Sequence, residues 1–281
     1  MRKIGDRGPG TGKAVAFTKA VATGNDFVIV DNRGGVLGKK PAGFARKICD
    51  RKRAVGADGL LLVERSKKAD LRMRIFNPDG TEPEMCGNGS RCVALYATAK
   101  GIAPKDMDIE TLAGVLNARV DGDMVKVKLT DPRDIKWNLC LMIHKCPYRV
   151  NFTNTGVPHV IHFVEDLDRV DVKDLGWKIR YHEDFAPAGT NVDFVKVVDK
   201  KNIKIRTYER GVEDETLACG TGSVASAIIA AEAEKLDSPI TVETRGGEKL
   251  KVYFDKIEGE FRNVYLEGRA QLVYEGVIKN V

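Results

Sequence analysis

The feature that most constrains the fold of this 281-residue chain is an internal repeat. The segment MRIFNPDGTEPEMCGNGSRCVALYATAKG (73–101) is matched by IRTYERGVEDETLACGTGSVASAIIAAEA (205–233). Within it, Cys86 and Cys219 lie 133 positions apart, and each precedes Gly-x-Gly-Ser. Solenoid repeats have periods of about 20 to 50 residues, so this repeat indicates a duplicated domain instead. It predicts two lobes related by pseudo-twofold symmetry, with the two cysteines facing each other across a cleft.

The local pattern predicts an α+β fold, because short β-branched and apolar runs outnumber helical segments. Each lobe is expected to wrap a mixed or antiparallel sheet around one buried helix, since the helical segments are apolar on nearly every side. The expected helices are 90–101 and 221–236, and the expected strands are 27–32, 59–66, 71–77, 146–152, 159–164, 192–198, 203–209 and 264–278. We expect a flexible extension (1–14), an N-terminal lobe (15–133 with a C-terminal strand, 268–281) and a C-terminal lobe (134–267).

Composition excludes several classes of function. The net charge of +6 is spread along the chain, which gives little support to nucleic-acid binding. No apolar run reaches the roughly 18 residues of a membrane span, and the N-terminus lacks the apolar core of a secretory signal. Six cysteines without Cys-x-x-Cys, and four histidines away from zinc-ligand spacing, predict neither a disulfide framework nor a metal site. These patterns favour a cytoplasmic protein without membrane or nucleic-acid partners.

The two cysteine motifs themselves predict a reaction. Each cysteine precedes a helix start, where glycines let the backbone approach a ligand and free N–H groups form an anion site. The same field is expected to lower the thiol pKa. If a substrate carboxylate sits between both helix starts, one thiolate can remove the α-hydrogen while the opposite thiol returns a proton to the other face. That exchange inverts a stereocentre.

The motifs resemble a known family. MCGNGSR and LACGTGS, together with ATGNDF, GADGLL, RIFNPDG, GTNVDF and YERGVEDE, closely resemble diaminopimelate epimerase from about Val21 onward. The resemblance implies a cofactor-independent isomerase that interconverts LL- and meso-diaminopimelate in lysine and peptidoglycan precursor biosynthesis. It also implies a small amino-acid substrate and, because the family is usually dimeric, a homodimer.

The resemblance also carries over site residues by position. Cys86 and Cys219 are the implied acid/base pair, and His159 is an implied supporting residue. The backbone at Gly87–Asn88 and Gly220–Thr221 is expected to hold the reacting carboxylate. The remaining implied substrate-binding residues are Asn25, Asn77, Asn191, Glu209 and Arg210, of which Arg210 suits a distal carboxylate because its planar fork pairs with both oxygens.

Two positions depart from the family pattern and leave the substrate open. Many members have asparagine where this chain has Val157, and some have glutamine where it has Gly59. A racemase of another amino acid, such as histidine, is therefore an alternative on the same scaffold. A non-catalytic amino-acid-binding or thiol redox protein is a third reading, which the paired cysteines and glycines disfavour.

Overall fold

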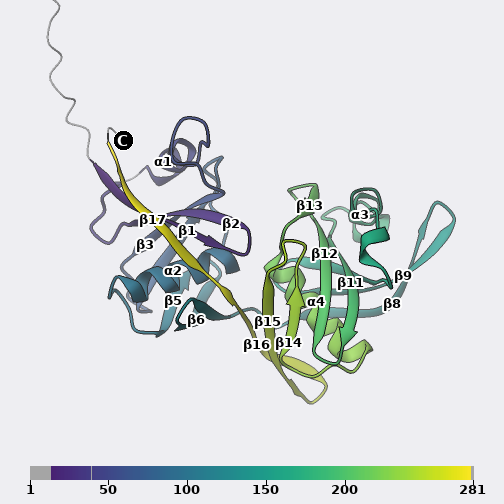
Figure 1. Cartoon of the computed structure of the whole chain (residues 1–281). Coiled ribbons are helices and arrows are strands. Elements are labelled where there is room, and N and C mark those ends of the chain that lie inside the picture. Colours follow the sequence, from purple (N-terminus) through teal and green to yellow (C-terminus); the bar gives the residue numbers. More distant parts are fainter. Residues whose placement is uncertain (1–13, 39, 280–281) are drawn as a thin grey trace, which may run out of the picture.

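The computed structural model describes residues 14–38 and 40–279, so nearly all of the predicted extension at 1–14 lies outside the described residues. The described chain forms two lobes built from one strand pattern (Figure 1). The first lobe contains β1 (Val15–Ala22), β2 (Asn25–Asp31), β3 (Gly59–Glu64), β4 (Leu71–Phe76), β5 (Asp106–Thr111), β6 (Gly114–Asp121) and β7 (Met124–Lys128). The second contains β9 (Cys146–Asn154), β10 (Pro158–Phe163), β11 (Asn191–Asp199), β12 (Asn202–Glu209), β14 (Ile240–Glu243), β15 (Lys249–Ile257) and β16 (Glu260–Arg269).

The strand pairings repeat in the same order in both lobes. From β1 to β7 the successive pairs are antiparallel, parallel, antiparallel, parallel, antiparallel and antiparallel. The series from β9 through β12 to β14, β15 and β16 has the same order. A short strand, β13 (Asp214–Thr216), adds a hairpin to β12 in the second lobe. The duplication and the α+β class predicted from the sequence are confirmed.

Two strands cross between the lobes. β8 (Arg133–Ile143) follows β7 of the first lobe and pairs with β9 of the second. β17 (Gln271–Ile278) follows β16 of the second lobe and returns to pair with β1, with Phe17 opposite Gly276. Its yellow ribbon runs among the purple strands of the first lobe in Figure 1. The lobes also join edge to edge, since β7 pairs with β16.

One long buried helix fills each lobe. α2 (Gly87–Ala99) and α4 (Gly220–Ala233) each begin one residue after a repeated cysteine. α4 is apolar on nearly every side, and Val224, Ile228 and Ile229 are fully buried. The buried side chains of both helices belong to one continuous apolar core. Burial on all sides explains why these helices lack the amphipathic pattern of a surface helix.

Two shorter helices were not expected from the sequence. α1 (Pro41–Ile48) begins with proline, which is favoured at a first helical position, and buries Phe44 and Ile48. α3 (Val172–Arg180) is capped by Asp171, whose side chain accepts the backbone N–H of Asp174. Single 3₁₀ turns occur at Leu167–Arg169 and Glu183–Phe185.

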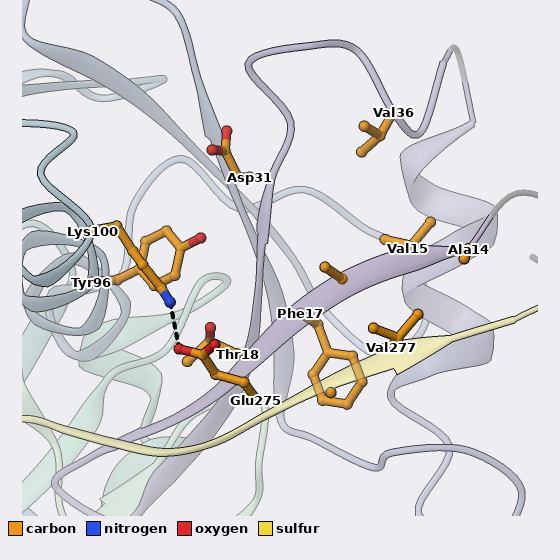
Figure 2. A pocket seen from close by; sticks show the side chains of 12 residues that line it. Ala14, Val15, Phe17, Thr18, Asp31, Val36, Tyr96, Lys100, Glu275 and Val277 are labelled. Atoms are coloured by element: carbon orange, nitrogen blue, oxygen red, sulfur yellow. Dashed lines mark hydrogen bonds and ion pairs between the residues drawn. The ribbon is translucent and has the colours of Figure 1, made fainter.

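A shallow hollow lies where β1 and β17 meet the end of α2 (Figure 2). Its volume is about 540 Å³, and an ion pair between Lys100 and Glu275 crosses it. Phe17, Tyr96 and Val277 line it, but none of the predicted site residues does. The hollow therefore offers no support for the predicted chemistry.

Candidate active site

Cys86 and Cys219 cap the two buried helices in the same way. Both residues have extended backbone angles. Cys86 Sγ accepts the backbone N–H of Gly89, and Cys219 Sγ accepts that of Gly222, each at 3.4 Å. The hydroxyls of Ser90 and Ser223 donate to the carbonyl oxygens of Cys86 and Cys219 at 2.9 and 2.8 Å. The repeated sequence therefore builds two equivalent helix starts, each with a sulfur over the first turn.

Both helix starts open into one cavity of about 600 Å³. A Cβ placed on Gly220 would lie 3.8 Å from Asn88 Oδ1, which shows how closely the two starts approach. The first N–H groups of a helix have no intrahelical acceptor, so they are available to an anion here. The wall includes eight of the predicted residues, namely Asn25, Cys86, Gly87, Asn88, Glu209, Cys219, Gly220 and Thr221.

Beneath Cys219, a buried polar chain extends away from the cavity. Asp193 Oδ2 lies 2.7 Å from His159 Nδ1, and both side chains are fully buried. An ionised carboxylate only accepts hydrogen bonds, so Nδ1 carries the hydrogen and Nε2 is the acceptor. Nε2 lies 3.0 Å from Thr221 Oγ1, which in turn lies 3.4 Å from Cys219 Sγ. The arrangement can carry a proton from Cys219 through the Thr221 hydroxyl to His159.

Among the described residues of the first lobe, no such chain lies beneath Cys86. There the residue pair facing Gly89 is Leu61 and Ile75, whereas Asp193 faces Gly222 in the second lobe. Leu61 pairs with Ile75 across β3 and β4, as Asp193 pairs with Thr207 across β11 and β12. The polar residues of the first lobe lie instead beside the cavity, where Asn88 Nδ2 donates to Asn25 Oδ1 at 2.6 Å. The duplicated scaffold thus carries different chemistry behind each cysteine.

Burial raises the pKa of three ionisable groups on the cavity wall, Cys86, Cys219 and Glu209. It raises the pKa of the Cys86 thiol, and the N–H groups of Gly89 and Asn88 and the charge of Arg91 only partly oppose it. Burial also raises the pKa of Cys219, with a further increase from the negative charges of Glu209 and Asp193. The pKa of Glu209 is raised by burial as well. The sequence-based expectation of lowered thiol pKa values is wrong, because desolvation outweighs the field of the helix starts.

Comparison with known proteins decides the family. The sequence model of the family described as diaminopimelate epimerase matches residues 17–134 and 151–273. The chain belongs to the diaminopimelate epimerase family. A diaminopimelate epimerase of Hydrogenobaculum sp. is 44% identical over 93% of this chain and 98% of its own length. One from the archaeon Archaeoglobus fulgidus is also 44% identical, over 94% of this chain and 96% of its own.

Solved structures share the fold at much lower identity. A phenazine biosynthesis protein of the PhzF family from Bacillus anthracis has a TM-score of 0.75 at 21% identity, covering 95% of this chain and 99% of that one. A probable proline racemase from Agrobacterium radiobacter has a TM-score of 0.66 at 14% identity, covering 93% of this chain and 92% of that one. Such distant similarity supports the two-lobed fold alone.

Four residues implied by the family pattern do not line the cavity. His159 and Asn191 lie behind the wall, and Asn191 Nδ2 approaches His159 Nε2 at 3.4 Å. The Asn191 side chain also accepts the backbone N–H of Arg210 at 2.7 Å. The Arg210 guanidinium donates to the carbonyl oxygens of Ala188 and Gly189, and Asn77 donates to Thr81. The Arg210 guanidinium is therefore held through Nη1 at Ala188 and Gly189, outside the cavity wall.

Several residues of the site were not identified from the sequence. Asp193 is fully buried within the apolar strand β11, and its only sequence signal is a carboxylate in an otherwise hydrophobic run. Asp58 lines the cavity and accepts the Asn25 amide at 3.1 Å. Thr216 and Leu217, which lie three and two residues before Cys219, also line the cavity. Leu217 is 60% exposed, so its apolar side chain stands at the open edge of the cleft.

The two departures from the family pattern have different surroundings. Val157 lines the cavity, so its apolar side chain directly alters the surface offered to a substrate. Gly59 is buried in β3, where an added Cβ would lie 3.1 Å from the Phe76 carbonyl oxygen and 3.3 Å from the Phe27 ring. A larger side chain at position 59 would require these neighbours to move. Of the two positions, Val157 bears directly on the cavity surface.

In residues 14–38 and 40–279, no group of three or more His, Cys, Asp and Glu side chains is placed to hold a metal ion. In the same part of the chain, no helix combines the length and apolar character needed to cross a bilayer.

Proposed function

We propose that the protein is a diaminopimelate epimerase that uses Cys86 and Cys219 as its two acid/base residues. The main support for this proposal is that both cysteines cap buried helices whose first turns open into one cavity. One thiolate removes the α-hydrogen, and the opposite thiol protonates the resulting carbanion on its other face. The carbon changes configuration, the sulfurs exchange protonation states, and no co-reactant is consumed.

The helix starts supply the stabilisation that this step needs. As the α-carbon loses its proton, negative charge moves onto the substrate carboxylate. The N–H groups at Gly87–Asn88 and Gly220–Thr221 are fixed by the helices, so they stabilise that charge without reorganising. Burial opposes thiolate formation at both sulfurs, and the first helical N–H groups oppose burial at each of them. At Cys219, the Thr221–His159 chain provides an acceptor for the thiol proton.

The relatives favour diaminopimelate over another amino acid. Both archaeal and bacterial proteins at 44% identity are named for this substrate across nearly the whole chain. We propose that Asn77, Asn191 and Arg210 bind its distal amino-acid end, with Arg210 released from its present carbonyl acceptors. Val157 removes one polar contact, a loss of about 0.5–1.5 kcal/mol, which raises KM by roughly tenfold at most.

We also propose the lobe boundaries expected from the repeat, the cytoplasmic location expected from the composition, and the homodimer implied by the family resemblance. The use of two protein thiols as acid and base implies that neither a cofactor nor a metal is required. Activity is therefore expected to survive both extensive dialysis and a chelator.

The function is tested by following deuterium incorporation at the α-carbon in D₂O by NMR. Diaminopimelate is expected to exchange much faster than lysine, histidine, glutamate or proline. Strong preference is expected because only diaminopimelate offers a complete second amino-acid end, with a carboxylate to pair with the charge of Arg210. Faster exchange with histidine or lysine would instead assign the protein as a racemase of that amino acid.

The acid/base roles are tested by Cys86→Ser and Cys219→Ser. Each variant is expected to lose at least about 10²-fold in epimerisation, because general acid–base groups typically contribute 10²–10⁴-fold. Loss of either residue should disable both directions, since each direction uses one sulfur as base and the other as acid. Circular dichroism provides the folding control. Near-normal turnover by either folded variant would exclude the two-thiol mechanism.

A further inference from the structure

Arg91, on the second turn of α2, is a fully buried cation. Its Nη2 donates to Thr23 Oγ1 and, at 2.6 Å, to Asn88 Oδ1, and neither partner is charged. Its Nε and Nη1 are buried and have no hydrogen-bond partner among the described residues. A guanidinium keeps its proton in a protein, so the charge stays in an apolar interior at a considerable energetic cost.

The repeat shows that the fold does not require this cation. In the second lobe, Val224 occupies the equivalent position, 133 residues later and one residue after the matching Gly-x-Gly-Ser. Val224 is also fully buried on its helix. The same scaffold therefore accepts a small apolar side chain at this place. The arginine must have a role that the second lobe does not need.

That role is indicated by a line of hydrogen bonds from Arg91 to the cavity wall. Asn88 accepts from Arg91, donates to Asn25 Oδ1 at 2.6 Å, and Asn25 Nδ2 donates to Asp58 Oδ2 at 3.1 Å. Arg51 holds the other oxygen of Asp58 at 2.7 Å. Arginine can only donate and an ionised carboxylate can only accept, so the two ends of the line impose the same direction on both amides.

The direction matters because Asn25 and Asn88 both line the cavity. Each NH₂ group uses one hydrogen within the line and keeps a second, while each amide oxygen already accepts a hydrogen bond. A reversed amide would offer oxygen instead of N–H and would repel a carboxylate. We propose that Arg91 is a positioning residue that, together with Asp58, fixes both asparagines as N–H donors toward the anionic substrate. This inference rests on the proposed function.

The charge of Arg91 has a second effect, on Cys86. The groups that face this thiol are the N–H groups of Gly89 and Asn88, the Arg91 cation and the Glu209 carboxylate. Arg91 lowers the pKa of Cys86, in opposition to burial and Glu209, and Glu248 lies within electrostatic range of Arg91 itself. Removing the cation should therefore raise the pKa of Cys86. Cys219 should change little, since Val224 holds the matching position.

A double-mutant cycle on kcat/KM tests the positioning role. In each single variant the remaining end of the hydrogen-bonded line, Asp58 or Arg91, still orients the two asparagines. We therefore expect Arg91→Met to lower kcat/KM about tenfold and Asp58→Asn about threefold, chiefly through a higher KM. The double variant should lose at least about 100-fold, more than the product of the single effects. Arg91→Lys keeps a charged donor and should stay within about threefold of wild type. Multiplicative effects, or an unchanged Arg91→Met, would overturn the proposal.

Val224→Ala is the matched control, because it alters the equivalent buried position and should leave kcat/KM nearly unchanged. If Arg91→Met does not fold, Arg91→Gln takes its place in the cycle, since it keeps polarity but can offer either oxygen or N–H.

Alkylation of Cys86 by iodoacetamide as a function of pH, followed by peptide mass spectrometry, needs no substrate. Its midpoint should move upward in Arg91→Met but not in Val224→Ala, and an unmoved midpoint would contradict the electrostatic effect. If wild type fails to exchange diaminopimelate while this shift is present, the proposed function fails and the charge effect of Arg91 stands.

Discussion

At the scale of single residues, Cys86 and Cys219 occupy equivalent positions but have neighbours of opposite charge. Arg91 lowers the pKa of Cys86 against burial and Glu209, whereas the charged groups acting on Cys219, Glu209 and Asp193, both raise its pKa beyond the effect of burial. A proton shared between the two sulfurs therefore favours Cys219. The duplicated backbone gives both cysteines the same geometry. The residues that differ between the two lobes make Cys219 the thiol that keeps its proton more readily, and Cys86 the one that loses it.

Asp26 provides a pH-dependent test of stability near the cleft. Burial alone would raise its pKa, but hydrogen bonds and charges from Arg51 and Lys19 lower it to about 2. The ionised Asp26 carboxylate therefore adds to the free energy of unfolding above the unfolded-state pKa of about 3.9. This contribution is lost as pH falls toward 2. Asp26→Asn should reduce the free energy of unfolding by about 1–2 kcal/mol at pH 7, allowing for solvent screening.

Urea unfolding at pH 7, 4 and 2.5 measures this contribution. The difference between wild type and Asp26→Asn should shrink as pH falls, because the Asp26 carboxylate becomes protonated first in the unfolded chain and only near pH 2 in the folded protein. A difference that stays constant over this range would show that the carboxylate charge is not the source of the stability.

The sequence predicted individual residues only where a local pattern marked them. The two cysteines were found because Cys-Gly-x-Gly-Ser occurs twice, and the eight predicted wall residues include these motifs. Asp193 and Asp58 were not found, because pairing between distant strands brings them to the site. The sign of the thiol pKa shift was also mispredicted, since the depth of burial depends on the whole fold.

At the scale of elements, the glycine two positions after Gly87 or Gly220 sets how closely each helix approaches its sheet. A Cβ on Gly89 would meet the end of the Leu61 side chain at 3.0 Å. A Cβ on Gly222 would overlap the Asp193 carboxylate, which His159 and Thr207 hold at 2.7 Å each. The same substitution therefore meets a movable methyl group in one lobe and a fixed carboxylate in the other.

Gly222→Ala and Gly89→Ala form a matched pair. Gly222→Ala should lower the free energy of unfolding by about 1–3 kcal/mol, because the added methyl group overpacks the helix–sheet contact. It should also reduce kcat at least tenfold by displacing Asp193 and with it His159. Gly89→Ala should cost less on both measures, since Leu61 can change rotamer. Thermal melting and steady-state kinetics compare the two, and equal effects would contradict this account.

Elements with strong local signals were predictable, and those that depend on packing were not. α2 and α4 were expected near their observed limits because each contains a long apolar run after a glycine-rich start. α1 and α3 have only 8 and 9 residues and mixed composition, so their stability comes from the sheet beneath them. The expected single strand at 264–278 is β16 and β17, which separate at Ala270 because they pair in different lobes.

At the scale of the whole molecule, the crossing of β8 and β17 makes each lobe depend on chain from the other half. Deleting 271–281 removes β17 and exposes the edge of β1, including Phe17, which packs against Gly276. We expect this truncation to lose cooperative thermal unfolding and to reduce soluble yield severalfold. Deleting only 279–281 keeps β17 intact and serves as the control. A truncated protein that melts like wild type would show that the first lobe is stable without β17.

The pairing of β17 with β1 also affects how the chain folds during synthesis on the ribosome. Phe17 is synthesised 259 residues before its partner Gly276 (276 − 17). At a typical elongation rate of about 5–20 residues per second, the edge of β1 waits on the order of 10–50 s for its neighbour. During that time an unpaired strand edge is open to pairing with other nascent chains. The protein's yield in a cell should therefore depend on translation speed and on chaperones that shield this edge until β17 leaves the exit tunnel.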